Sequence, residues 1–305
     1  MYIFFLFLIS AALALSQNLT AKFSSNALVG KPASSYAFFM VISGAVSCLF
    51  YLATNGFRLY TTPTMFLFSF GFTLALCLSN VGILTVYRYM NVANVLVILS
   101  SAQLIITAVC GKILFDETIT ATTVIRILVM LVCIFLMFLD GRTRSESEQA
   151  TEKIKVGVKR VLITVLLLVI TIASNASIVL LNKFYTIAGN VTDEKSYLFF
   201  GNLFMVAASI VMLAYTYIRS PEDGRATLAI AKTKPMIFML INSIGGGAAL
   251  LVSIAIISRL AVSVATPISS AVGMLMTVAS SLILREKIGI FAYIAVALSI
   301  IVFVI

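Results

Sequence analysis

The sequence predicts an all-α polytopic membrane protein, with ten transmembrane helices arranged as two inverted five-helix repeats. Three observations support this fold class. Of the 305 residues, 61% are hydrophobic and 10% are charged, whereas charged residues make up about a quarter of an ordinary water-soluble domain. The apolar residues form continuous runs of about 20 residues, the length that a helix needs to cross a bilayer. Finally, the second half of the sequence repeats features of the first half.

The apolar runs place ten helices along the chain. They are continuous and do not alternate between polar and apolar residues, so we expect helices and not barrel strands. No basic residue precedes the first run, and no cleavage site of small residues follows it. We therefore expect it to be a helix of the protein and not a signal peptide. The predicted spans are 2–21, 36–54, 64–87, 92–114, 119–139, 160–182, 196–218, 235–258, 262–284 and 288–305.

A polar linker at 140–159 divides the chain almost in half, and two offsets align the halves. We therefore expect one repeat at 1–139 and a second at 160–305. Because each repeat has an odd number of helices, the second enters the membrane from the opposite side. Secondary transporters have such inverted repeats, with the substrate site near the midplane between them. The matches include Lys22 with Lys183 and Ser35-Tyr36 with Ser196-Tyr197 at offset 161, and Ser100-Ser101-Ala102 with Ser269-Ser270-Ala271 and Glu117 with Glu286 at offset 169.

The fourth and ninth predicted helices end in similar turns. The fourth runs into ILFDETIT at 113–120, and the ninth runs into LILREKIG at 282–289. With its ten helices in two sets of five, the sequence resembles the EamA type of the drug/metabolite transporter superfamily over essentially the whole chain. The resemblance carries over to single residues only at Glu117 and Glu286, which we expect to cap these turns and not to bind substrate.

Polar side chains are concentrated in the first, third, fourth, sixth, eighth and ninth predicted helices. Polar groups are costly in a lipid-facing surface, so we expect these helices to face protein or water, and the resemblance implies the same helices around a central cavity. Hydrogen bonding between helices is the alternative role for each side chain. The residues predicted to line the substrate pathway are Asn18, Lys22, Asn80, Tyr87, Arg88, Gln103, Asn175, Lys183, Asn242, Arg259, Ser269 and Ser270.

The fifth and tenth predicted helices contain few polar residues, so we expect them at the periphery. There they would face lipid or a second copy of the chain in a homodimer. A different irregularity is the triplet Gly245, Gly246 and Gly247 in the eighth helix, because glycine has a poor helix propensity. Close packing, a hinge and a locally unwound ligand site are the alternatives for the triplet. Pro267 in the ninth helix is likewise predicted to be a hinge or packing residue.

The distribution of charge restricts the substrate. All eleven acidic residues lie at predicted helix ends or in loops, and the chain has no histidine. Proton-coupled exporters of cationic drugs need a carboxylate within the membrane, so this mechanism is disfavoured. Lys22, Lys183, Arg88 and Arg259 lie at the ends of helices assigned to the cavity, where they suit a carboxylate or phosphate. The alternative for each cation is to extend its charged end to the lipid headgroups.

These observations predict a secondary transporter of a small polar metabolite, neutral, zwitterionic or anionic, such as an amino acid. The motif GxxxxGK[ST] is absent, so we expect no direct use of ATP. A proton-coupled multidrug exporter is the alternative within transport, and a membrane-embedded enzyme or a non-transporting membrane partner is the alternative outside it. Catalysis is disfavoured because the chain has no histidine and only isolated cysteines. For the same reason we expect no metal and no cofactor.

The excess of Lys and Arg, 21 against 11 acidic residues, lies in short loops between apolar runs, so we expect no nucleic-acid partner. Fifteen of these cations lie in the connections on the side opposite the two termini. The positive-inside rule places that side in the cytoplasm, whereas the family resemblance implies cytoplasmic termini. Both orientations stay open, as do the substrate, the direction of transport and the coupling ion. The short loops favour the plasma (inner) membrane of a prokaryote.

Overall fold

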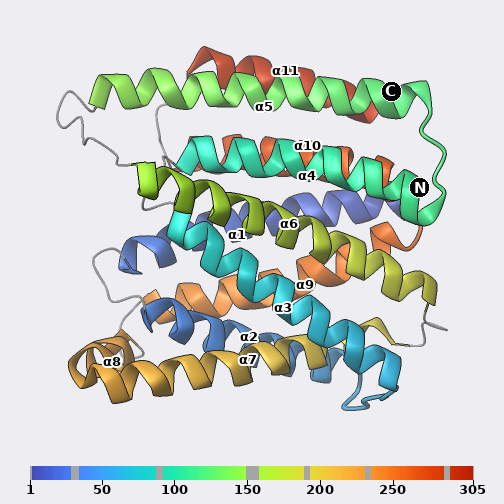
Figure 1. Ribbon diagram of the computed structural model, residues 1–305. Helices are drawn as coiled ribbons and strands as arrows, with labels where there is room; N and C mark the ends of the chain where they lie inside the picture. Colours follow the sequence, from blue (N-terminus) through green and yellow to red (C-terminus); the bar gives the residue numbers. More distant parts are fainter. Residues whose placement is uncertain are drawn as a thin grey trace. The chain divides into compact units, whose positions relative to one another are not determined.

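The computed structural model describes residues 2–28, 34–86, 92–148, 158–188, 193–230, 235–284 and 289–304. All regular structure within these ranges is helical (Figure 1). The helices are α1 (Tyr2–Leu28), α2 (Ser34–Thr54), α3 (Pro63–Val86), α4 (Val92–Phe115), α5 (Ala121–Glu148), α6 (Val158–Ala188), α7 (Glu194–Arg219), α8 (Pro221–Ala229), α9 (Pro235–Ile257), α10 (Val262–Ile283) and α11 (Ile290–Val304).

Seven stretches of the described helices are long and apolar enough to cross a membrane. They lie in α1, α2, α5, α6, α7, α9 and α10, and shorter apolar stretches lie in α3, α4 and α11. The expectation of an all-helical, polytopic membrane protein is therefore confirmed. The full set of ten spans and the inverted repeat stay predictions.

A helix lies at each of the ten predicted spans, and two features differ from the prediction. The helix α5 continues to Glu148, well into the predicted linker, because residues 140–148 are polar but contain no proline and only one glycine, Gly141. The short helix α8 was not predicted, because its sequence PEDGRATLA is polar and far shorter than a membrane span.

The chain forms two compact units, and each unit combines segments from both halves of the sequence. Unit 1 contains residues 1–74 and 184–255, and unit 2 contains residues 75–183 and 256–305. The unit boundaries fall inside α3, α6 and α9. The compact units therefore differ from the predicted repeats, which follow the order of the sequence.

In unit 1, α2 packs along α7 (Figure 1). The acidic residue Asp193 fixes the start of α7: its side chain accepts a hydrogen bond from the Lys195 backbone N–H at 3.1 Å, as N-cap residues do. The same carboxylate accepts hydrogen bonds from Asn55 Nδ2, beyond the end of α2, and from the Ser196 hydroxyl. Buried Asp193 thus joins a connection of the first half to a helix of the second half.

In unit 2, α4 and α10 pack together, and α5 packs along α11 (Figure 1). A cluster of buried apolar side chains joins these four helices through Leu104, Met130, Ile134, Ala271 and Val302. The outer side of α5 presents exposed apolar residues such as Val132 and Phe135, as expected for a lipid-facing helix. The homodimer through α5 and α11 stays a prediction.

Candidate functional site

A helix of the first half and a helix of the second half meet in unit 1 at what we call the α1–α9 contact, formed by Gln17, Thr20, Asn242, Gly245 and Gly246. The Thr20 hydroxyl donates a hydrogen bond to Asn242 Oδ1 at 3.1 Å. One turn away, the Gln17 side chain lies beside Gly245 and Gly246. Because the residue numbers run in opposite directions, α1 and α9 are antiparallel at this contact.

The glycines let the Gln17 carboxamide lie close to the backbone of α9. A Cβ atom on Gly246 would lie 3.1 Å from Gln17 Nε2, closer than most real Cβ contacts, and one on Gly245 would lie 3.5 Å from Gln17 Cγ. Gly246 is the middle residue of α9, and Gln17 lies within one turn of the middle of α1. The contact therefore places a carboxamide at mid-length of both helices.

The two carboxamides of this contact keep hydrogen-bonding groups unused. Asn242 accepts from Thr20, but its Nδ2 has no partner in the described part of the chain. The side chain of Gln17 likewise has no hydrogen bond to any described residue. Both side chains are half-buried. A carboxamide offers two donors and an acceptor, so this contact can still bind a polar ligand.

The other side of the glycine triplet packs against α2. The buried Tyr51 hydroxyl donates a hydrogen bond to the Gly247 carbonyl oxygen at 3.0 Å. The Ser47 hydroxyl donates one to the Ser243 carbonyl oxygen at 3.4 Å. A Cβ on Gly247 would lie 3.2 Å from Phe50 Cδ1. Of the three alternatives for the triplet, the structure has close packing in a continuous helix, with no unwound segment in α9. A hinge at this triplet stays a prediction.

Unit 2 contains a similar contact between the halves, the α3–α6 contact, formed by Ser79, Gly82, Thr171 and Asn175. The Ser79 hydroxyl donates to Asn175 Oδ1 at 3.0 Å. One turn away, a Cβ on Gly82 would collide with Thr171 Oγ1. Asn175 also donates from Nδ2 to the Thr171 carbonyl oxygen at 3.2 Å. The carboxamide of Asn175 thus uses both its oxygen and its nitrogen within the protein.

The turn between α9 and α10, also in unit 2, is held by one cation and one anion. Lys183 Nζ donates to the carbonyl oxygens of Ile257 at 2.9 Å and Leu260 at 3.0 Å. The Glu117 carboxylate accepts from the backbone N–H groups of Val262 at 2.7 Å and Ser263 at 3.0 Å, and from the Ser263 hydroxyl at 2.8 Å. Each charge is therefore at the helix end whose dipole it complements.

These contacts give two charged residues partners that the sequence did not show. Lys183, predicted to attract an anionic substrate, uses its ammonium group on backbone carbonyls. Glu117 is a cap as expected, but its carboxylate caps α10 of the second half. Its backbone N–H closes its own turn by donating to the Gly111 carbonyl oxygen, where Asp116 has a left-handed φ of 49°.

The remaining predicted pathway residues are distributed between the units. Asn18 lies in unit 1 on α1 and is half-buried. Gln103, Arg259, Ser269 and Ser270 lie in unit 2, where Arg259 and Ser269 are exposed. Pro267 is buried inside α10. Outside the described residues lie Tyr87, Arg88, Glu286 and the side chains of Lys22 and Asn80.

The prediction missed Gln17, Thr20, Ser79 and Thr171 as site residues. Their type gave a weak signal, because a hydroxyl or amide in an apolar helix is as often a packing residue as a ligand. Gln17 and Thr20 differ from other polar residues because they contact α9. A single sequence does not show which helix lies beside them.

Comparisons with known proteins show the fold alone. No family model and no curated protein matches the sequence. The structure is similar to a solved crystal structure of another protein that is 14% identical, with a TM-score of 0.63, over 99% of this chain and 94% of that one. At this identity the similarity supports the fold and says nothing of the activity.

Proposed function

We propose that the chain is a secondary transporter that moves a small polar solute across the membrane by alternating access. The observation that supports it is the α1–α9 contact, where Gln17 and Asn242 keep unused hydrogen-bonding groups at the middle of apolar helices. Unused polar groups are costly inside a membrane, and they mark substrate pathways more often than lipid-facing surfaces. The predicted repeat adds a mechanism, because inverted halves can open to either side of the membrane in turn.

The chemistry of the contact favours a neutral or zwitterionic solute. A carboxamide is uncharged, and it can hydrogen-bond to hydroxyl, amino and carboxylate groups because it has both donors and an acceptor. The one predicted pathway lysine whose side chain is described, Lys183, is engaged with the α9–α10 turn. An anionic solute would therefore depend on Lys22, Arg88 or Arg259. We further propose that the chain acts in the plasma membrane of a prokaryote.

The experiment is a thermal-stability screen of the detergent-purified protein with amino acids, nucleosides, vitamins, sugar phosphates and lipophilic cations. A stabilising solute is then tested for flux into proteoliposomes, with and without a pH gradient. We expect a neutral or zwitterionic solute to stabilise the protein, and the variants Gln17→Ala and Asn242→Ala to weaken its binding about tenfold each, since each removes a hydrogen bond to the solute.

The matched control is Ser79→Ala, which removes the corresponding hydroxyl of the α3–α6 contact and should leave solute binding intact. Stabilisation by lipophilic cations alone, with flux driven by a pH gradient, would replace the proposal by the multidrug exporter. Binding without flux of the bound solute would favour an enzyme or a non-transporting membrane partner.

A further inference from the structure

The connection between α2 and α3, residues 55–62, exposes apolar side chains in unit 1. We call it the α2–α3 loop. Phe57 is 75% exposed, Tyr60 54% and Leu59 37%. Arg58, which lies between them, is exposed as well. One short loop thus combines three exposed apolar side chains with a cation.

The backbone at the end of α2 presents Phe57 to the outside. The helix ends in a Schellman motif, in which the Gly56 N–H donates to the Ala53 carbonyl oxygen at 3.2 Å. The Phe57 N–H donates to the Leu52 carbonyl oxygen at 2.9 Å. Gly56 has the left-handed φ of 63° typical of this motif, and Phe57 also has a left-handed φ, of 60°. Bulky residues rarely adopt this conformation, and residues strained in this way cluster at functional positions.

Hydrogen bonds hold the α2–α3 loop at the start of α7. Asn55 Nδ2 donates to the Asp193 carboxylate and to the Arg58 carbonyl oxygen. The Tyr60 N–H donates to the Ser196 hydroxyl at 3.1 Å. Because Asp193 is the N-cap residue of α7 and Ser196 lies in its first turn, the loop has a defined place beside this helix end.

The helix ends around the loop place it at a membrane surface. The candidate span of α2 ends at Thr54, the apolar stretch of α3 begins at Pro63, and the candidate span of α7 begins at Glu194. A lipid-exposed loop is excluded from the hydrocarbon core, because its backbone polar groups would lack partners there. Exposed apolar side chains are unfavourable in water. The interface between headgroups and acyl chains satisfies both conditions.

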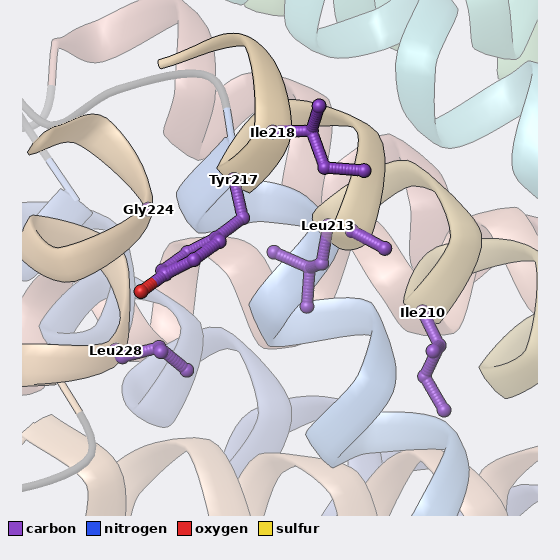
Figure 2. Close-up of a pocket in the computed structure, with 7 residues that line it drawn as sticks. Ile210, Leu213, Tyr217, Ile218, Gly224 and Leu228 are labelled. Atoms are coloured by element: carbon purple, nitrogen blue, oxygen red, sulfur yellow. The ribbon is translucent and has the colours of Figure 1, made fainter. Parts of the chain in front are cut away.

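The connection at the other end of α7 is built differently. There the helix α8 packs on α7, with Gly224 against Tyr217. Leu228 of α8 lines an apolar groove of about 330 Å³ together with residues of α7 such as Leu213 (Figure 2). That connection directs an apolar side chain toward α7, whereas the α2–α3 loop bonds to α7 through polar groups and leaves Phe57 exposed.

We propose that the α2–α3 loop is an anchor in the membrane interface, which inserts Phe57, Leu59 and Tyr60 among the phospholipid headgroups. Apolar and aromatic side chains bind a bilayer in this way at the boundary between headgroups and acyl chains. Arg58 can extend its charged end to the phosphates at the same level. The hydrogen bonds to Asp193 and Ser196 then transmit the depth of the anchor to α7. The inference is independent of the transported solute.

The chain has no tryptophan, so one introduced tryptophan reports the depth of its position. We would reconstitute Phe57→Trp in phosphatidylcholine vesicles and measure quenching by phosphatidylcholine brominated either close to the headgroup or close to the end of the acyl chain. The matched control is Phe70→Trp, the same substitution at an exposed position of α3 about 10 Å further along the helix. We expect shallow bromine to quench Phe57→Trp about twofold more than deep bromine, and the reverse for Phe70→Trp.

Two results would overturn the proposal. Quenching of Phe57→Trp by neither lipid would place the loop in water, where it could bind a soluble partner. Stronger quenching by deep bromine would place it in the hydrocarbon core.

A second pair of variants tests the role of Phe57 itself, with Tyr60→Trp as the reporter. In this background Phe57→Asn removes the ring, and Asn tolerates a left-handed φ, so quenching by shallow bromine should fall about twofold. Phe57→Leu keeps an apolar side chain and should retain the quenching. Unchanged quenching in Phe57→Asn, or an equal loss in Phe57→Leu, would refute the assignment of Phe57 to the anchor.

Discussion

The α1–α9 contact of unit 1 and the α3–α6 contact of unit 2 are built alike but differ in what they leave unpaired. Each joins antiparallel helices from the two halves of the chain by a hydroxyl that donates to an Asn Oδ1, and each has a glycine one turn from that bond. In unit 2 the Asn175 nitrogen donates a hydrogen bond to a carbonyl oxygen of its own helix. In unit 1 the donors of Gln17 and Asn242 have no partner among the described residues. The difference separates a contact that serves packing from one that can also bind a ligand.

The comparison also bears on the predicted repeat. Pairing Thr20 with Asn175, and Ser79 with Asn242, matches α1 with α6 and α3 with α9, the same helices that the sequence offset matches. However, Thr20 and Asn175 are 155 positions apart, six fewer than the offset of 161 that aligns Lys22 with Lys183. Six residues are nearly two helical turns. The register between α1 and α6 that superposes the two contacts therefore does not align Lys22 with Lys183.

The largest expected effect tests whether the polar groups of unit 2 serve stability. Glu117→Ala removes the acceptor of three hydrogen bonds at the start of α10, and we expect it to lower the free energy of unfolding by about 2–3 kcal/mol. Thermal unfolding in detergent would show this as a loss of several degrees. Glu117→Gln keeps one acceptor oxygen and should lose about half as much. An unchanged unfolding temperature for Glu117→Ala would refute the capping role.

A smaller effect is expected from the glycines of the two contacts. Gly82→Ala places a methyl group on Thr171, and we expect a loss of about 1–3 kcal/mol by overpacking. Gly245→Ala meets its nearest neighbour at an ordinary 3.5 Å and should be neutral or slightly stabilising. Thermal unfolding compares the two variants directly. Gly82→Ala combined with Thr171→Ala should recover most of the loss, and no recovery would place the strain elsewhere.

The smallest effect on stability, and the sharpest test of the comparison, comes from the two asparagines. Asn175→Ala should cost about 0.6 kcal/mol, typical of a hydrogen bond between membrane helices, and should leave solute affinity unchanged. Asn242→Ala should cost no more than this but weaken solute binding about tenfold. Unfolding temperature and equilibrium binding of the stabilising solute separate the two effects. A loss of affinity in Asn175→Ala equal to that in Asn242→Ala would remove the distinction between the units.

The long apolar helices could be predicted from the sequence because a membrane span is defined by length and composition alone. The short helix α8 could not, since its nine residues owe their place to contacts such as that of Gly224 with Tyr217. The polar extension of α5 was missed for a related reason: a run of apolar residues predicts only the part of a helix that lies within the membrane.

The candidate site was predicted only in part. The sequence indicated α1 and α9 as polar helices, and it indicated Asn242 and the glycine triplet as candidates. Asn242, Gly245 and Gly246 do lie at the α1–α9 contact. The roles of Thr20 and Gln17 depend on the register between two helices more than 200 residues apart, and composition does not encode register. For Lys183 the sequence left two roles open, a substrate ligand or a cation that reaches the headgroups, and it could not show that the carbonyls of Ile257 and Leu260 lie within its reach.

The α9–α10 turn differs from an ordinary ion pair in its response to charge reversal. Two side chains that bind each other can often exchange their charges and keep their attraction. Lys183 and Glu117 each bind backbone groups, carbonyl oxygens at the end of α9 and amide N–H groups at the start of α10. The direction of the chain fixes which of these groups faces each side chain. The exchange of Lys183 and Glu117 would therefore place an anion on oxygens and a cation on N–H groups, so the sign at each position is set by the polarity of the backbone and not by the partner residue.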